Sequence, residues 1–150
     1  MEQKLEGWMG LEINRDKTKI ISLKHNKSYL DFLGFTFRFE RDLFAGTTKY
    51  LNVFPAKKSM GNERKALKSM TGSNYCFVPI PDLIKSLNRN LIGWSNYFNF
   101  GYPRKSFRQM NNYVRNRLYI HLNRRSQRRF KWPKDISVHK FFDLLGLIYL

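Results

Sequence analysis

Two long stretches with helical spacing, separated by a break at Gly101-Tyr102-Pro103, constrain this chain more than any other feature of its sequence. In the first, which begins at Pro81, apolar residues share one helical face: Leu83, Leu87, Leu91, Trp94 and Phe98. The second has a similar stripe: Phe107, Met110, Val114 and Leu118. Because 99–103 is long enough only for a tight connection, we predict two antiparallel helices. For the aromatic rings near the end of the first helix, core packing is favoured over base stacking.

The second helix is rich in arginine, and the sequence contains no acidic residue between Asp82 and Asp135. At about 100° per residue, Arg104, Arg108 and Arg115 fall within roughly 40° of one another, beside the apolar stripe. Like charges aligned in this way repel one another unless a counterion is bound. We therefore interpret them as a phosphate-binding face rather than as a solvated charged surface.

The whole chain is strongly basic, with 28 Lys and Arg against 11 Asp and Glu and a formal net charge of +17. Nucleic acid is the leading partner, because each phosphate contact releases counterions. An anionic membrane surface is a weaker alternative, since the arginines are interleaved with Asn, Gln and Tyr, and a merely basic protein is the third. The candidate RNA-binding residues are Arg104, Lys105, Arg108, Tyr113, Arg115, Arg117, Tyr119, Arg124, Arg125, Arg128 and Arg129.

The remaining composition narrows the class of protein. Cys76 is the only cysteine among the 150 residues, which excludes a disulfide within the chain and a multi-cysteine zinc site. A reducing compartment agrees with this, and we expect a cytoplasmic location. No apolar run approaches the roughly 20 residues of a membrane span, so no membrane partner is expected.

The first third of the chain has strand-like alternation. The clearest strand is 31–39, where Leu33, Phe35, Phe37 and Phe39 alternate with small or polar residues, and 50–54 returns as its hairpin partner. Shorter strands are predicted at 11–13 and 19–23, after a helix end at 1–8. Beyond Pro55 we predict an exposed helix at 57–70 and a last helix capped by Ser137. The expected fold is α+β, with a small antiparallel β unit followed by a three- or four-helix bundle.

A search for catalytic groups finds none. Glu40 and Asp42 are the closest acids, and a solvated turn near Arg41 explains them better than a metal site. His25 and His139 lack metal-ligand spacing, and His121 falls on the apolar side of its helix, where a packed histidine is the default. We expect neither a cofactor in this chain nor catalysis by the chain alone.

Three blocks of the sequence resemble group II intron-encoded reverse transcriptases, also called maturases. Residues 10–18 resemble the family's "GLxxNxxKT" block, Phe32–Phe35 its "FLGF" block, and Leu87–Phe98 the opening of the maturase-specific domain, the thumb or domain X. The catalytic Tyr-x-Asp-Asp block that precedes them in the family is not among these residues. The chain thus resembles the C-terminal part of such an enzyme.

The resemblance implies a division into a palm remnant at 1–55 and a helical maturase-specific domain at 56–150. It implies a place near the incoming nucleotide for Lys17 and primer-supporting backbone at Leu33, Gly34 and Phe35, for which a structural role is an equal alternative. For the full-length family it implies Mg²⁺, intron RNA as partner, and assistance in intron folding and splicing.

Four hypotheses follow. The first is a non-catalytic, RNA-binding maturase domain. The second is a thumb that clamps a primer–template duplex for RNA-directed DNA synthesis when joined to the missing polymerase half. The third is a basic DNA-binding or structural module unrelated to introns. The last is a poorly folding gene remnant that exposes apolar surface around Phe35, Phe37 and Phe39.

Overall fold

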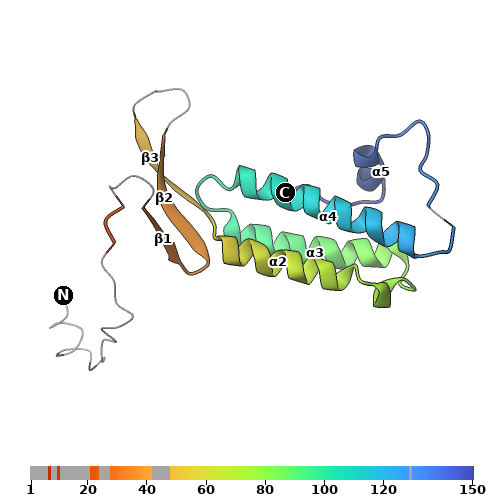
Figure 1. Ribbon diagram of the computed structural model, residues 1–150, viewed down its shortest axis with the longest axis horizontal. Helices are drawn as coiled ribbons and strands as arrows, with labels where there is room; N and C mark the ends of the chain where they lie inside the picture. The colour runs from red at the N-terminus through yellow and green to blue at the C-terminus, as the bar shows by residue number, and fades with distance from the viewer. Residues whose placement is uncertain (1–6, 8–9, 11–20, 24–27, 42–47, 129) are drawn as a thin grey trace.

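The computed structural model describes residues 7, 10, 21–23, 28–41, 48–128 and 130–150. A small antiparallel sheet, in the order β1-β2-β3, lies beside a group of helices (Figure 1). Its strands are β1 (Tyr29–Phe32), β2 (Phe35–Arg41) and β3 (Lys49–Pro55). The helices are α2 (Lys57–Met70), α3 (Ile80–Phe98), α4 (Arg104–Arg124) and α5 (Val138–Leu144), with a short 3₁₀ helix η1 (Ser73–Tyr75). The predicted α+β class is confirmed.

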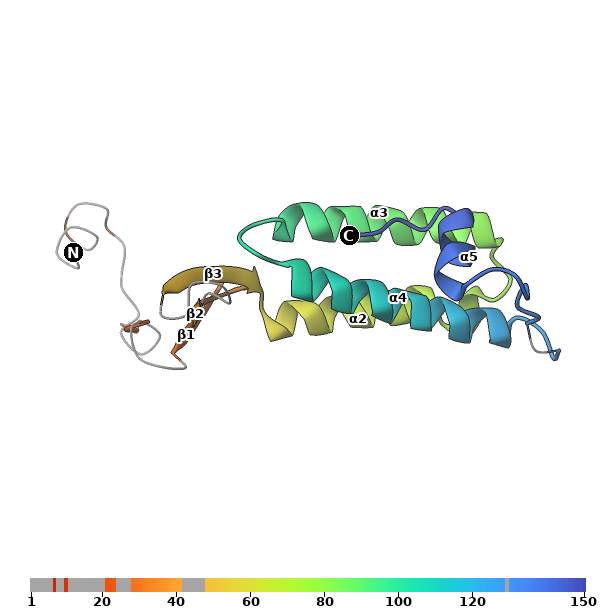
Figure 2. The same ribbon diagram turned by 90° about the horizontal axis from the view of Figure 1, so that it is seen from above.

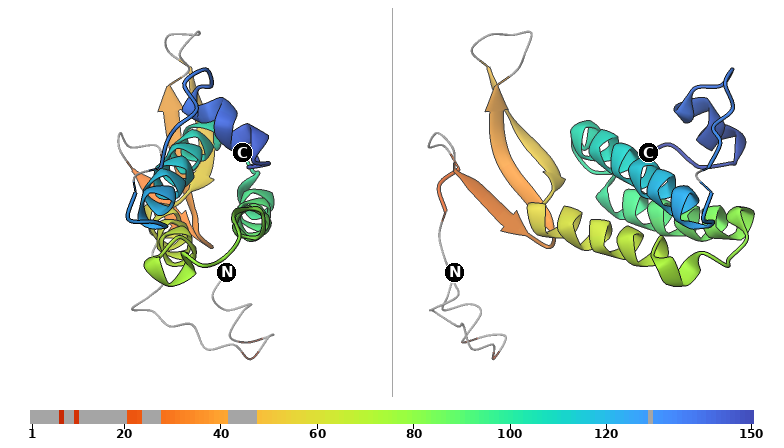
Figure 3. Two further views of the ribbon diagram at one scale, coloured as in Figure 1. Left: turned by 90° about the vertical axis from the view of Figure 1, so that its right-hand side faces the viewer. Right: turned by 45° about the vertical axis from the view of Figure 1, so that its right-hand side comes forward.

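The three long helices run side by side (Figure 2). α2 and α4 point away from the sheet, and α3 returns antiparallel to both, as the tight connection predicted. Viewed from the end, α2, α3 and α4 form a triangle, and α5 lies over the side between α3 and α4 (Figure 3). Ser137 accepts a hydrogen bond from the Lys140 N–H and caps α5, as predicted.

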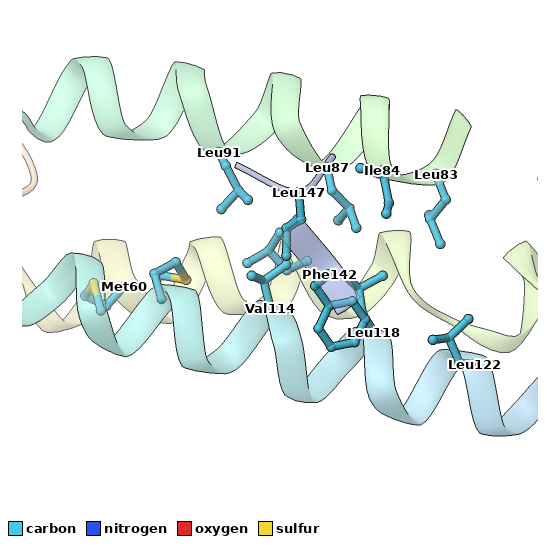
Figure 4. Close-up of a cluster of buried hydrophobic side chains, with 12 residues drawn as sticks. Met60, Leu83, Ile84, Leu87, Leu91, Val114, Leu118, Leu122, Phe142 and Leu147 are labelled. Carbon is cyan, nitrogen blue, oxygen red and sulfur yellow. The ribbon is translucent and has the colours of Figure 1, made fainter. Parts of the chain in front are cut away.

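The core lies where the predicted apolar stripes of α3 and α4 face each other (Figure 4). Leu87 and Leu91 of α3 and Leu118 of α4 are fully buried. Phe142 and Leu147, from the last part of the chain, fill the space between the two helices. Each such side chain contributes about 1.5–3 kcal/mol through burial, so this interface dominates the stability of the helical part.

Two asparagines attach the extended segment 146–150 to the helices. The Asn88 amide of α3 donates to the Gly146 carbonyl (2.7 Å) and accepts from the Ile148 N–H (3.1 Å). The Asn111 amide of α4 likewise donates to the Leu150 carbonyl (3.1 Å) and accepts from its N–H (3.2 Å). These bonds satisfy backbone groups that have no regular secondary structure around them, and they close the bundle.

The predicted single strand at 31–39 is wrong, because the chain reverses at Leu33-Gly34. Both residues have positive φ, 49° and 83°, and Phe32 pairs with Phe35 across a two-residue turn. Leu33 continues the apolar alternation in sequence, yet its side chain is 68% exposed. The second hairpin, between β2 and β3, was predicted and is confirmed.

Other predictions for the first third of the chain have mixed outcomes. Ile21–Leu23 has no strand, and Ile21 is exposed, so that part of the predicted 19–23 strand is wrong. The predicted strand at 11–13, and the helix end at 1–8 apart from Gly7, lie outside the described residues. The 57–70 helix is present, but it is not simply exposed, since Met60 and Leu67 enter the core.

Candidate nucleic-acid interface

The basic residues of α4 divide into an exposed set and a buried set. The exposed set comprises Arg104, Lys105, Arg108, Arg124 and, just beyond the helix, Arg128. None of these five cations has a hydrogen-bond or ion-pair partner within the described part of the chain. Three of them lie in the first turns of α4, close to the sheet (Figure 1). They remain available for an external anion.

Arg115, which helical geometry placed beside Arg104 and Arg108, is not available. Its side chain is 5% exposed, and its guanidinium donates to the Tyr149 hydroxyl (3.0 Å) and lies over the Tyr149 ring. Arg115 does lie on the same strip of α4 as Arg104 and Arg108. Segment 146–150, however, covers this strip at the level of Asn111 and Arg115. Arg104 and Arg108 escape because they lie nearer the start of the helix.

Two other candidates bind backbone carbonyls within the protein. Arg117 donates to the Thr71 hydroxyl (3.0 Å) and to the carbonyls of Lys68 (3.5 Å) and Thr71 (3.3 Å), at the end of α2. Arg125 donates to the Val78 carbonyl (2.5 Å). A cation at a helix C-terminus satisfies orphan carbonyls and the helix dipole, so Arg117 holds the end of α2 against α4. Arg125 holds the loop before α3 against the end of α4.

His121 lies within the same group of contacts and is fully buried, as its apolar position predicted. Its Nδ1 donates to the Thr71 carbonyl at 3.4 Å. Burial lowers the pKa of His121, the bond to Thr71 opposes this, and the nearby positive charges of Arg125, Arg117 and Arg124 lower it further. The ring is therefore neutral at physiological pH and serves as packing.

Both candidate stacking tyrosines already have aromatic or cationic neighbours. The half-buried Tyr113 donates to the Arg64 carbonyl (3.1 Å), with the Arg64 guanidinium 5.8 Å from its ring centroid. Tyr119 stacks on Trp132 with ring centroids 5.1 Å apart. Tyr119 is nevertheless 45% exposed, so it keeps more accessible ring surface than Tyr113.

A basic cleft of about 950 Å³ lies between the sheet, the start of α2 and the start of α4. Its floor is the sheet face on which Arg38 pairs with Asn52 and Glu40 pairs with Tyr50. Its walls carry the remaining cations: Lys57, Arg64, Arg104 and Lys105. With Arg38 these make five cations against one acid, Glu40. Sequence reasoning found Arg104 and Lys105 but missed the other three.

Glu40 is held in place inside this cleft. It forms an ion pair with Arg38 and accepts a hydrogen bond from the Asn52 amide (2.8 Å). Burial tends to raise the pKa of Glu40, but these two hydrogen bonds and the charges of Arg38 and Lys105 outweigh burial and lower it. The predicted solvated turn is thus wrong for Glu40, whose carboxylate is fixed on the sheet, while Asp42 lies outside the described residues.

A shallower cleft of about 330 Å³ continues the first along the seam between α2 and α4. Arg64 and Gln109 line both clefts, and Asn112, Tyr113 and Asn116 complete the second. Gln109, Asn112 and Asn116 recur at helical spacing on α4, away from its apolar stripe. That polar spacing was visible in the sequence and was the one signal for this part of the surface.

The "FLGF" residues join the sheet to the helices. The Leu33 carbonyl accepts from the Tyr97 hydroxyl (3.0 Å), and the Gly34 carbonyl accepts from the Ala56 N–H (2.8 Å) and the Ser59 hydroxyl (2.9 Å). The Phe35 ring packs on Tyr97 and Phe98. The carbonyls of Leu33 and Gly34 and the ring of Phe35 thus all have partners within the protein. Lys17 and Arg129 lie outside the described residues.

Among the described residues, no three His, Cys, Asp or Glu side chains come together as a metal site. Over the same part of the chain, no helix combines the length and apolar character needed to cross a membrane.

The comparison with protein families identifies the helical part. The model of the group II intron maturase-specific domain matches residues 62–136, from α2 to the segment beyond α4. These are 75 of the 150 residues, and they include every exposed cation of α4 described above. No match was found among curated proteins. The chain therefore belongs to the group II intron maturase-specific domain family.

Proposed function

We propose that this chain binds the RNA of a group II intron and assists its folding for splicing. The observation that carries the proposal is the group of unpaired cations at the start of α4. Arg104, Lys105 and Arg108 are exposed, lack carboxylate partners in the described structure, and lie in the segment that matches the maturase family. A folded RNA supplies phosphates at the density that such a group can use.

Uncharged polar side chains beside these cations favour a structured RNA as the ligand over an arbitrary polyanion. The polar seam of Gln109, Asn112 and Asn116 continues from these cations along α4. Amide side chains donate and accept hydrogen bonds, and thus suit ribose hydroxyls and base edges as well as phosphates.

The test is the affinity of intron RNA for two variants with equal loss of charge. The first replaces Arg104, Lys105 and Arg108 by Gln. The matched control replaces Lys85, Arg89 and Lys140, three exposed cations of α3 and α5, by Gln. Affinity falls as salt is raised, and each phosphate contact makes this fall steeper. If three contacts are lost, the slope of log affinity against log salt should become less negative by roughly 2–3 in the first variant and change little in the control. Equal effects in both variants would mean that net charge alone binds the RNA.

A second function, a thumb that clamps a primer–template duplex, is favoured by one observation. The sheet face opposite the cleft exposes Phe32, Phe39 and Leu51. An apolar sheet face of this kind is suited to packing on a further polypeptide segment, such as a polymerase palm. Restoration of DNA synthesis when the chain is mixed with a polymerase half that lacks this region would support this function.

A further inference from the structure

We propose that the cleft between the sheet and the start of α4 binds one unpaired ribonucleotide of the RNA. This proposal rests on the function proposed above and adds a ligand and a place for it. The cleft draws its residues from β2, β3, α2 and α4, so it exists only in the folded chain (Figure 1). Its volume of about 950 Å³ lies in the range of small-ligand pockets, which is too small for a duplex.

The first argument is charge. Five cations and one carboxylate line the cleft, and that carboxylate, Glu40, is already bound by Arg38 and Asn52. The backbone N–H groups at the start of α4 add to the positive field, because this helix has no side-chain cap. A phosphate group is therefore the anion that fits the α4 side of the cleft.

The second argument is a pair of unsatisfied polar groups on the cleft floor. Asn52 is 6% exposed, and its Oδ1 has no hydrogen-bond partner within the described structure. The buried Nε of Arg38, which pairs with Asn52 across the strands, also lacks one there. A buried acceptor and a buried donor left unpaired each cost about 1–3 kcal/mol. The base and ribose of a nucleotide supply both donors and acceptors, which matches the one acceptor and one donor left open on the floor.

The third argument is an exposed ring at the edge of the cleft. Tyr102 is 63% exposed and lines the cleft, where it forms a T-shaped pair with the Tyr50 ring at 5.4 Å between centroids. Its backbone is fixed by an N–H bond to the Val53 carbonyl (3.2 Å). A ring that is held by its backbone and open on its surface is suited to stacking on a base.

The experiment compares two RNA hairpins that differ in one bulged adenosine. The wild-type chain should bind the bulged hairpin about tenfold tighter than the fully paired one, since base stacking on an aromatic ring is worth about that factor or more. Tyr102→Ala should reduce the preference to less than about twofold and leave affinity for the paired hairpin unchanged. Phe77→Ala, which removes an exposed ring outside the cleft, should keep the preference.

Asn52→Leu is the second cleft variant, and its folding is checked by circular dichroism. It should also lose the preference. Equal binding of both hairpins by the wild type would overturn the cleft proposal while leaving RNA binding intact. Absence of binding to both hairpins and to intron RNA would overturn both proposals. A preference that survives Tyr102→Ala and Asn52→Leu would overturn the assignment to this cleft, and displacement of the bulged hairpin by equimolar adenosine 5′-monophosphate would overturn RNA as the source of the nucleotide.

Discussion

The guanidinium of Arg115 lies over the ring of Tyr149, with its central carbon 4.2 Å from the ring centroid and one N–H donating to the Tyr149 hydroxyl. Arg108, two turns earlier on the same strip of α4, is exposed. Two arginines on the same side of α4 therefore differ in environment: Arg115 is buried in the fold, and Arg108 is exposed on its surface.

This difference leads to opposite expectations for two alanine variants. Arg115→Ala should lower the free energy of unfolding by about 2 kcal/mol, because it removes a charged hydrogen bond and a cation–π contact. Arg108→Ala should change that free energy by less than about 0.5 kcal/mol. Urea unfolding measures the first quantity, and RNA binding by the folded protein should fall only for Arg108→Ala. A loss of RNA affinity in folded Arg115→Ala would contradict the buried role.

Gly101 should be irreplaceable, because its φ is +71° and an added Cβ would lie 2.4 Å from the Val53 carbonyl oxygen. Gly101→Ala should therefore destabilise the chain by more than about 1 kcal/mol. Gly61→Ala is the control, since this residue lies inside α2 with open space around its Cα. It should stabilise by about 0.5–1 kcal/mol. Equal midpoints of urea unfolding for the two variants would be inconsistent with the close approach of the α3–α4 connection to Val53 of β3.

The two asparagines that hold segment 146–150 should protect different amides from hydrogen exchange. Asn88→Ala removes the acceptor of the Ile148 N–H and should speed its exchange, whereas Asn111→Ala should do so for the Leu150 N–H. Nuclear magnetic resonance resolves the two signals. Each variant serves as the control for the other, and faster exchange at both amides in both variants would show that the segment opens as one unit.

Glu63 predicts a pH dependence of stability. Burial raises its pKa to about 7, and its Oε1 has no partner within the described structure. The folded state thus keeps a proton that the unfolded state loses near the ordinary value of 4.5, so this group's contribution to stability falls as pH rises from about 4.5 to 7.

Glu63→Gln should remove that loss. The variant should match the wild type near pH 4 and exceed it by about 1–3 kcal/mol at pH 8, as measured by urea unfolding at both pH values. Because the difference between variant and wild type is taken at each pH, the titration of His121 cancels. If the difference in unfolding free energy between variant and wild type were constant across this pH range, the pKa of Glu63 would not be raised by folding.

The helices could be predicted because their information is local. Leu83, Leu87 and Leu91 recur at helical spacing, and the break at Gly101-Tyr102-Pro103 leaves little choice of connection. The Leu33-Gly34 turn was missed because Leu33 preserves the alternation of a strand. Only the hydrogen bonds from Ala56 and Ser59 to the Gly34 carbonyl, which come from later in the chain, mark the reversal.

The site could be predicted only in part, for the same reason. Arg104 and Arg108 were found from charge and helical angle. Arg115 was misplaced because the residue that covers it, Tyr149, is 34 positions away. Arg38 and Asn52 become part of the cleft only through strand pairing and the return of α4 to the sheet. No local pattern in the sequence indicates that these residues lie close together in the fold.

The attachment of segment 146–150 to Asn88 and Asn111 bears on how such a domain can be exchanged between genes. A recombination that moved only residues 62–136 would carry the arginines of α4 into its new host. It would leave behind Phe142 and Leu147, which fill the core, and Tyr149, which covers the buried guanidinium of Arg115 and accepts its hydrogen bond. The smallest piece that can be inherited as a working unit is therefore longer than the stretch by which its ancestry is recognised.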